Sequence, residues 1–371
     1  MEKLCVIYNY TQNYRKAIFK LIDSRFQSVW YFGRNQTDVE GFDIGILKDA
    51  HLVDNKYFKF HFYYQKDIIN LAFKKDIGAF LVLGDPFCVS TWMLCMKVKL
   101  ATHKKIYFWT HGWYGKETSL RKIFKKVFFN LADGIFLYGN YARDMMISEG
   151  FDKNRLFVIH NSLDYDNQIK IRKELTNTNL FQDHFKNDNK NLIFIGRLTT
   201  VKKLDLILDA LASLNKKGEY YNLTFIGDGV EIENLKKKVV QENLLQQVWF
   251  YGKCYDDKVV AEFLYNADLC VAPGNVGLTA MHSMVFGTPV ITHNDFKYQM
   301  PEFESIKENV TGSFFERDNL QSMVSCIQKW FSCNSTKREA IRLNCYEEID
   351  KYWNPYFQIK VLEDHLNYEH F

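Results

Sequence analysis

Two cations and a glycine stand close together in residues 195–205, "IGRLTTVKKLD". Gly196 and Arg197 follow a short apolar run, and Lys202 comes five residues after Arg197, where a helical pattern begins. Guanidinium and ammonium groups bind phosphate oxygens through charge-assisted hydrogen bonds, and the first turn of a helix adds unpaired N–H groups. The segment therefore predicts a site where both cations bind one diphosphate. The alternative is a pair of solvated surface cations.

Residues 273–291, "PGNVGLTAMHSMVFGTPVI", have the outline of a strand end, a glycine turn, a short helix and a second strand. The N–H groups near Gly277, Leu278 and Thr279 would lie at the helix N-terminus, where unpaired donors and the helix dipole attract a phosphate. The stretch contains no carboxylate, so it offers phosphate binding rather than carboxylate acid–base chemistry. A third glycine turn, "IGDG" at 226–229, is a weak signal alone, because many strand–helix turns look like it.

Strands and helices must position these turns, and the chain contains two regions in which predicted strands alternate with predicted helices. Strands are predicted at 3–9, 28–33, 77–85, 105–112, 134–139 and 156–162, with helices at 14–26 and 61–75. After a polar stretch the alternation restarts, with strands at 191–197, 223–229, 248–252 and 268–274 and helices at 203–218, 231–244 and 258–267. Strands that alternate with helices indicate parallel sheets.

The predicted fold class is therefore α/β, with two doubly wound Rossmann-like domains that face each other across a ligand-binding cleft. An N-terminal domain is predicted at 1–172, a linker at 173–190 and a second domain at 191–340. The C-terminal residues 341–371 read as helices, with a break at Pro355, that cross back to the first domain.

Composition excludes several classes of protein. The 371 residues carry a net charge of +4 with a pI near 8.4, which does not indicate a nucleic-acid binder. The eight cysteines show no zinc-ligand spacing. The N-terminus lacks a signal-peptide core, and no apolar run approaches the ~20 residues of a membrane-spanning helix. A soluble, cytoplasmic protein is expected.

Residues 119–133, "SLRKIFKKVFFNLAD", predict a basic amphipathic helix. Its cations, Arg121, Lys122, Lys125 and Lys126, are interleaved with Leu, Ile, Val and Phe. Helices of this kind lie in membrane interfaces. The alternative is an ordinary helix that faces the core and has a solvated basic face.

Taken in order, the segments "IGRLTTVKKLD", "IGDG", "VWFYG" and "GNVGLTAMHSMVFGTPVI" resemble the C-terminal domain of GT-B glycosyltransferases. More narrowly, they resemble family 4 of the retaining, nucleotide-sugar-dependent enzymes, of the glycosyl transferases group 1 type. The resemblance is strong over 191–295. In the first half of the chain it rests on the element pattern and on "THG", which contains His111.

The resemblance implies roles for individual residues. Arg197 and Lys202 match the cations that hold the donor pyrophosphate, and His111 matches a catalytic histidine near the donor sugar. The alternative for His111 is a satisfied histidine at a strand end. The remaining positions implied to bind the donor are Gly196, Gly227, Tyr251, Gly252, Lys253, Asn275, Val276, Gly277, Leu278, Thr279 and His282.

One departure from the family concerns carboxylates. The family commonly has two glutamates separated by seven residues, one facing the donor sugar and one facing the ribose. Alignment on "GTPVI" places Gly274 and His282 at these positions. His282 could hydrogen-bond the ribose, or it could merely pack beneath the turn. Catalysis does not need the pair if the cations and the helix N-terminus stabilise the departing diphosphate.

The resemblance implies a retaining glycosyltransferase that moves a sugar from a UDP- or GDP-sugar to a glycan acceptor, lipid-linked, in surface polysaccharide synthesis. No cofactor and no divalent metal are expected, because no Asp-x-Asp pair lies in a donor loop. The enzyme would be cytoplasmic and peripheral on the inner membrane face. The alternative is a catalytically degenerate GT-B protein that binds a nucleotide sugar or a partner enzyme. The missing glutamates favour that alternative, whereas Arg197, Lys202 and His111 oppose it.

Overall fold

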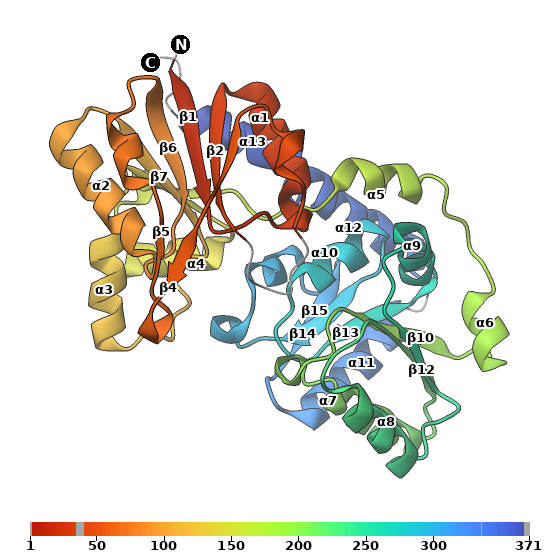
Figure 1. The fold of residues 1–371 in the computed structure, drawn as a ribbon. Coiled ribbons are helices and arrows are strands. Elements are labelled where there is room, and N and C mark those ends of the chain that lie inside the picture. The colour runs from red at the N-terminus through yellow and green to blue at the C-terminus, as the bar shows by residue number, and fades with distance from the viewer. Residues whose placement is uncertain (1, 35–40, 335, 367–371) are drawn as a thin grey trace. The chain divides into compact units, whose positions relative to one another are not determined.

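A computed structural model describes residues 2–34, 41–334 and 336–366, and it divides the chain into two compact units (Figure 1). The first unit comprises Met1–Asp164 and Asn354–Phe371, and the second comprises Tyr165–Trp353. Each unit has its own parallel β-sheet with helices packed against it. The predicted α/β class with two Rossmann-like domains is confirmed. The division falls at 164/165 and 353/354, whereas the sequence predicted boundaries at 172, 191 and 341.

The seven-stranded sheet of the first unit has the order β3-β2-β1-β6-β7-β8-β9, and every pairing is parallel. The order reverses between β1 and β6, as in a doubly wound fold. The strands are β1 (Lys3–Tyr8), β2 (Ser28–Gly33), β3 (Ala50–Val53), β6 (Ile77–Leu83), β7 (Lys105–Thr110), β8 (Gly134–Leu137) and β9 (Leu156–Val158). The helices are α1 (Lys16–Arg25), α2 (Val89–Ala101), α3 (Ser119–Phe129), α4 (Asn140–Ser148) and α13 (Pro355–His365).

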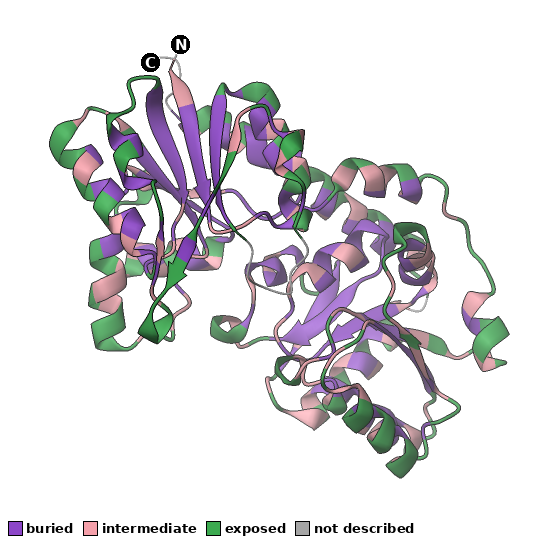
Figure 2. Cartoon of the chain, viewed as in Figure 1, coloured by how far each residue is buried: buried purple, intermediate pink, exposed green. Residues whose placement is uncertain are grey.

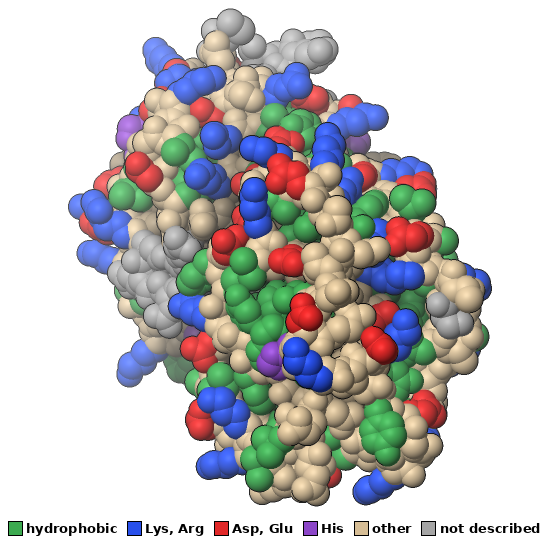
Figure 3. Space-filling model, turned by 90° about the vertical axis from the view of Figure 1, so that its right-hand side faces the viewer, with side chains coloured by type: hydrophobic (Ala, Val, Ile, Leu, Met, Phe, Trp, Pro, Cys, Tyr) green, Lys and Arg blue, Asp and Glu red, His purple; other side chains and the backbone are tan. Residues whose placement is uncertain are grey.

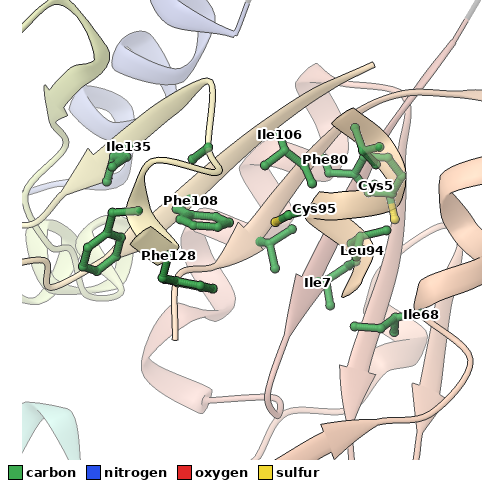
Figure 4. Close-up of a cluster of buried hydrophobic side chains, with 14 of the residues drawn as sticks. Cys5, Ile7, Ile68, Phe80, Leu94, Cys95, Ile106, Phe108, Phe128 and Ile135 are labelled. Carbon is green, nitrogen blue, oxygen red and sulfur yellow. The ribbon is translucent and has the colours of Figure 1, made fainter. Parts of the chain in front are cut away.

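Alternation along β1 explains why helices cover both faces of this sheet. Leu4, Val6 and Tyr8 point to one face, where they join the core formed with α1 and α13. Cys5 and Ile7 point to the other face, where they pack with side chains of α2 and α3 (Figure 4). Because successive side chains of a strand point in opposite directions, an unbroken apolar run buries both faces.

The segment predicted to be a helix at 61–75 is not one. The structure has a short strand there, β5 (Tyr63–Gln65), which pairs with β4 (Asn55–Tyr57), and then a 3₁₀ turn at Ile69–Phe73. Asp67 between them has a φ of +66°, which a helix does not tolerate. The helix that follows, α2, was not predicted. Its sequence is almost entirely apolar, so it shows little of the one-sided pattern that marks a surface helix.

The sheet of the second unit has the order β12-β11-β10-β13-β14-β15 and is also parallel, with its reversal between β10 and β13. Its strands are β10 (Lys190–Ile195), β11 (Tyr221–Ile226), β12 (Val248–Gly252), β13 (Leu269–Ala272), β14 (Val290–His293) and β15 (Gly312–Phe315). The helices are α5 (Tyr165–Arg172), α6 (Leu180–Phe185), α7 (Asp205–Asn215), α8 (Ile232–Gln241), α9 (Asp257–Asn266), α10 (Leu278–Val285), α11 (Leu320–Asn334) and α12 (Arg338–Tyr352).

The predicted strands of the second unit are confirmed, but three of them end two or three residues earlier than predicted. They end at Ile195, Ile226 and Ala272, before the glycine turns that follow. Most of the sheet is buried, and exposed residues gather on the outer faces of the helices (Figure 2).

Of the helices described after residue 164, only α13 belongs to the first unit. Asn354 caps α13 by accepting hydrogen bonds from the N–H groups of Tyr356 and Phe357, and Pro355 occupies the first helical position. The α13 residues Ile359 and Leu362 lie in the first core. Helix α12, which was predicted to cross back as well, remains in the second unit, where it packs against α10.

Candidate active site

The predicted phosphate-binding turns gather at the carboxyl end of the second sheet, where the strand order reverses. Gly196 directly follows β10, and Gly274 lies two residues after β13, the neighbouring strand across the reversal. Open α/β sheets bind ligands at this point, because adjacent strand–helix loops turn to opposite faces and leave a crevice. The loops predicted to bind the donor therefore lie beside one another in the fold.

One of the predicted glycines, Gly227, allows the turns after β10 and β11 to approach closely. Gly196 has a φ of +141° and Gly227 a φ of +139°, which are values that favour glycine. A Cβ on Gly227 would lie 2.0 Å from the carbonyl oxygen of Gly196. The N–H of Gly227 donates to the carbonyl of Gly252 at 2.8 Å. The turns after β10, β11 and β12 therefore form one continuous backbone layer, which a side chain would disrupt.

The two predicted phosphate cations lie in different environments. Arg197 is exposed, whereas Lys202 is partly buried in the 3₁₀ turn Thr200–Lys202 that precedes α7. The Lys202 ammonium donates to the carbonyl of Asn275 at 2.7 Å. Burial, with a smaller contribution from Arg197, lowers the pKa of Lys202 to about 8, and Glu302 opposes the shift. Lys202 is therefore held in place by the protein, whereas Arg197 is exposed to solvent.

Gly274 touches the backbone of the Lys202 turn. Its N–H donates to the carbonyl of Lys202 at 2.9 Å. A Cβ on Gly274 would lie 2.1 Å from the carbonyl oxygen of Val201 and 2.6 Å from the Cα of Lys202. The position where the family commonly has a glutamate thus has no room for any side chain here. Gly274 instead makes a backbone hydrogen bond that holds the turn containing Lys202.

The turn before α10 is held by its own side chains and by a buried glutamine. The hydroxyl of Thr279 donates to the carbonyl of Ile195 at 2.8 Å, which ties α10 to β10. The N–H of Val276 donates to the side-chain oxygen of Gln299 at 2.7 Å, so this amide is not available to a phosphate. Gln299 is 3% exposed and also donates to Thr292 and to the carbonyl of His293, each at 2.9 Å.

Donors for a phosphate remain at the start of α10. Gly277 is the N-cap of this helix, and the N–H groups of Leu278 and Thr279 in the first turn have no intrahelical acceptor. The side-chain oxygen of Asn275 is buried and has no hydrogen-bond partner among the described residues. In the predicted turn, the backbone of Gly277, Leu278 and Thr279 can therefore bind an anion. The N–H of Val276 is instead used within the loop, by its hydrogen bond to Gln299.

His282 lies one turn beyond Thr279 on α10 and is partly buried. Desolvation lowers its pKa to about 4, so the imidazole is neutral at pH 7. A neutral imidazole can donate one hydrogen bond and accept another, which suits a hydroxyl better than a phosphate.

The predicted base-reading loop follows β12. The ring of Tyr251 leans on Phe263 of α9, with ring centroids 4.7 Å apart. Lys253 lies over the ring of Tyr255 at 4.7 Å. Gly252 has a φ of +92°, which turns the chain away from the sheet.

Sequence reasoning missed two residues that support this site, Gln299 and Glu302. Glu302 lies in the 3₁₀ turn Pro301–Ser305, is 2% exposed and acts electrostatically on Lys202. No spacing rule links a residue in this turn to a lysine one hundred positions earlier in the chain. Only the closeness of the two turns in the folded unit reveals this carboxylate, whereas the segment 273–291 contains none.

His111 belongs to the first unit, at the equivalent place in that sheet. A pocket of about 350 Å³ opens where the order reverses between β1 and β6. It is lined by Asn9, Gln12, Tyr14, Arg15, Leu83, Gly84, Asp85, Pro86, Phe87, Thr110, His111, Gly112, Tyr114, Lys125, Phe129 and Tyr138. Loops after β1, β6, β7 and β8 supply most of these residues.

The electrostatics of this pocket keep His111 neutral. Its ring lies 4.6 Å from that of Tyr138, and its Nδ1 is buried without a hydrogen-bond partner among the described residues. Burial, and then the positive charges of Arg15 and Lys125, lower its pKa to about 4. A neutral imidazole in a pocket can accept or donate a hydrogen bond to a substrate hydroxyl. The alternative of a fully satisfied histidine does not fit an unpaired Nδ1.

Nothing in the described parts of the chain indicates a metal site or a membrane span. No group of three or more His, Cys, Asp or Glu side chains could hold a metal ion within residues 2–34, 41–334 and 336–366. Over the same residues, no helix combines the length and the apolar character that crossing a bilayer requires.

Comparison with known proteins gives a family match in the second unit. Residues 176–347 match the family model of the glycosyl transferases group 1. The chain is 34% identical over 103 residues to a GDP-mannose-dependent alpha-(1-6)-phosphatidylinositol dimannoside mannosyltransferase of Mycobacterium tuberculosis, covering 27% of this chain and 26% of the relative. It is 25% identical over 194 residues to a poly(ribitol-phosphate) alpha-N-acetylglucosaminyltransferase of Staphylococcus aureus, covering 50% and 34%. The match thus spans about a quarter to a third of these relatives.

Solved structures match over almost the whole chain. Anabaena HepE in complex with UDP has a TM-score of 0.72 at 14% identity, covering 98% of this chain and 99% of that chain. The lipopolysaccharide outer core galactosyltransferase WaaB gives the same score, identity and coverage. At this identity the likeness establishes the fold, which is that of the GT-B glycosyltransferases.

Proposed function

From a second unit that matches the glycosyl transferases group 1 in a chain with the GT-B fold, we propose a glycosyltransferase that uses a nucleotide sugar. One observation carries the proposal. The turns after β10 and β13 meet at the strand reversal and gather Arg197, Lys202 and the N-terminus of α10, which together can neutralise a diphosphate. A diphosphate is the leaving group when a sugar is transferred from a nucleotide sugar.

The protein must then stabilise charge as the sugar departs. Arg197 and the fixed Lys202 supply positive charge, and the N–H groups at the start of α10 supply aligned dipoles. This machinery needs no divalent cation and no carboxylate nucleophile, so we infer a metal-independent, retaining reaction. Substitution on one face of the sugar, with the donor phosphate accepting the acceptor's proton, is compatible with these groups.

The acceptor is proposed to bind in the first unit, in the pocket beside His111. The mannosyltransferase of M. tuberculosis and the poly(ribitol-phosphate) transferase of S. aureus are named for acceptors that are glycolipids or cell-wall polymers. HepE has been captured with UDP-glucose. We therefore propose a UDP- or GDP-sugar as the donor and a glycan as the acceptor, in the synthesis of a surface polysaccharide or glycolipid.

We further propose a cytoplasmic enzyme that touches the membrane surface through α3. Phe128 and Phe129 of this helix face the core, whereas Leu120, Ile123 and Val127 form an exposed stripe that is 81%, 62% and 53% accessible. Its lysines are partly engaged in the protein: Lys122 pairs with Glu149, and Lys125 pairs with Glu117 at 2.7 Å. The apolar stripe, rather than the charge, therefore supports the membrane proposal.

A nucleic-acid partner is not proposed. On the face seen in Figure 3, Lys and Arg side chains are interspersed with Asp and Glu side chains rather than gathered into a basic patch. A net charge of +4 is also small for a protein that binds phosphate backbones.

Donor hydrolysis and thermal shift test the function without knowledge of the acceptor. The chain is mixed with UDP, GDP, ADP and CMP and with their sugars. A ligand at one hundred times its dissociation constant should stabilise the fold by about 2.7 kcal/mol. Slow release of nucleotide from one sugar donor is expected, and it should be lost in Arg197→Ala and Lys202→Ala. A nucleotide that binds but is never released from its sugar would instead identify a degenerate, non-catalytic protein.

Vesicle binding tests the membrane contact. The triple variant Leu120→Ser, Ile123→Ser and Val127→Ser should lose binding to vesicles of anionic phospholipid. A matched control removes three exposed apolar side chains from the second unit through Val230→Ser, Val240→Ser and Leu245→Ser. Equal loss in both variants, or wild-type protein that ignores the vesicles at low salt, would refute the contact.

A further inference from the structure

Arg15 is a buried cation that has no acidic partner in the part of the chain that the structure describes. It ends the 3₁₀ turn Asn13–Arg15 that leads into α1, and it is 4% exposed. Its guanidinium donates to the phenol oxygens of Tyr8 and Tyr138. Four aromatic rings surround it, with centroids 5.1–5.5 Å from Cζ: Tyr8, Tyr14, Trp109 and Tyr138. Among the described residues, no carboxylate pairs with Arg15, and the largest contributions to its electrostatic environment come from desolvation and from the phenols of Tyr138, Tyr8 and Tyr14.

Such an arrangement leaves the charge of Arg15 only partly compensated. Ring faces and phenol oxygens attract a cation, but a buried charge is strongly unfavourable unless it is paired and its donors are satisfied. The Nε–H of Arg15 is buried and has no hydrogen-bond partner among the described residues. A guanidinium presents donors in a planar fork that fits two oxygens of one carboxylate or phosphate. The site is therefore short of an oxyanion.

Arg15 lines the pocket of about 350 Å³ that also contains His111. The other titratable groups in its wall are Asp85, Lys125 and the phenols of Tyr14, Tyr114 and Tyr138. Lys125 already pairs with Glu117 at 2.7 Å and donates to the carbonyl of Gly112 at 3.0 Å. Burial raises the pKa of Asp85, and the cation that acts on this carboxyl electrostatically is Lys125 rather than Arg15. Among the described residues of this wall, Arg15 is thus the cation that has no carboxylate paired with it.

The rest of the wall suits a sugar. Tyr14, Tyr114 and Phe87 present aromatic rings, against which the C–H face of a sugar ring can stack, and Asn9 and Gln12 offer amide donors and acceptors. The volume lies at the small end of the range for ligand pockets, which fits a group the size of a monosaccharide.

We propose that this pocket takes a saccharide acceptor that carries a compact oxyanion, a phosphate or a carboxylate, and that Arg15 is the residue that anchors it. The inference rests on the proposed function, because it names the chemical class of that enzyme's acceptor. The oxyanion supplies a counter-charge that the residues described by the structure do not provide, and the hydroxyls of the same sugar then lie in the pocket that contains His111.

Isothermal titration calorimetry on the full chain tests the inference with four probes: glucose 1-phosphate, glucuronate, glucose and inorganic phosphate. We expect at least one charged sugar to bind tenfold or more tightly than glucose and than inorganic phosphate. Whether the phosphate sugar or the uronate binds identifies the source of the oxyanion. Equal binding of charged and neutral sugars, or of inorganic phosphate and glucose 1-phosphate, would overturn the proposal.

Variants of Arg15 then locate the anion. Arg15→Gln should weaken the binding of the charged sugar at least tenfold and leave the affinity for glucose unchanged. Arg15→Lys should recover part of the lost affinity for the charged sugar. The matched control is Arg25→Gln, which removes an exposed guanidinium from α1. If Arg15→Gln does not fold, the proposal is tested by comparing the affinities of the four probes for the wild-type protein and for the Arg15→Lys variant.

Titration of UDP and GDP separates this inference from the proposed function. We expect the nucleotide dissociation constant to be the same in the wild-type protein and in the Arg15 variants. A nucleotide that binds less tightly to Arg15→Gln would show that Arg15 serves the donor, and the acceptor inference would fall. A wild-type protein that binds no nucleotide but binds the charged sugar through Arg15 would refute the proposed function alone.

Discussion

Replacement of Gly274 by alanine tests whether the position of the Lys202 turn requires glycine at residue 274. The new Cβ would lie 2.1 Å from the carbonyl oxygen of Val201, whereas ordinary contact begins near 3.4 Å. The atoms nearest to this Cβ belong to the backbone of Val201 and Lys202. No flexible side chain can move aside, so either the Gly274 loop or the Lys202 turn must shift by about 1 Å. The hydrogen bond from Gly274 to Lys202, 2.9 Å long, would stretch or break.

Two consequences of this movement can be measured separately. Overpacking of this kind costs about 1–3 kcal/mol of unfolding free energy. Because the displaced loop contains Lys202, the phosphate site moves as well, and a misplacement of about 1 Å can reduce function by about 100-fold. We therefore expect Gly274→Ala to lower the urea midpoint and to weaken the binding of a nucleoside diphosphate at temperatures where the variant is folded.

Gly274→Glu restores the family's residue at this position and should be worse than Gly274→Ala, because the same clash remains and a carboxylate is added. The control is Gly45→Ala, where a Cβ meets nothing closer than 3.4 Å. Alanine at such a site should leave stability unchanged or raise it by about 0.4–1 kcal/mol. Full stability and full nucleotide affinity in Gly274→Ala would refute the reasoning, as would a gain of transfer activity in Gly274→Glu.

Three further predictions concern charge. The Lys202 ammonium, with a pKa of about 8, loses its proton as pH rises, so nucleotide affinity should fall between pH 7 and 9.5 in the wild type but stay level in Lys202→Arg, as calorimetry can check. The folded protein holds the pKa of His111 and His282 near 4, below the usual 6.5. Their contribution to stability is therefore complete above pH 6.5 and is lost as pH falls toward 4; the melting temperature should drop from pH 7 to pH 5, and less so in the double His→Gln variant. Transfer activity should survive EDTA, and activity that returns only with Mn²⁺ would contradict the metal-independent mechanism.

The role of His282 can be tested against simple packing. His282→Ala should raise the nucleotide dissociation constant with little change in melting temperature if the imidazole binds the ribose, and His282→Glu should retain part of that binding. A lower melting temperature with an unchanged dissociation constant would show that the side chain only packs beneath the turn.

The sequence by itself determined the fold class and located the glycine turns that are proposed to bind phosphate. Apolar runs bounded by glycine turns fix strands such as β10 and β11, because their pattern is local and does not depend on distant partners. The grouping of Gly196, Arg197 and Lys202 beyond a strand is equally local. The region 61–75 was misjudged because its apolar spacing suits a helix, whereas the folded chain pairs Tyr63–Gln65 with β4 and turns at Asp67, whose φ is +66°.

Tertiary structure alone decided which groups meet. Glu302 reaches the neighbourhood of Lys202, and Gln299 occupies the N–H of Val276, through loops that adjoin only when the parallel strands are paired. Gly274 looked like a lost glutamate, but the structure makes it the contact that positions Lys202. Arg15 lies in the predicted helix 14–26, and only its burial among four rings beside a pocket sets it apart. Local sequence specifies backbone conformation, whereas burial and charge pairing depend on segments that chain folding brings together.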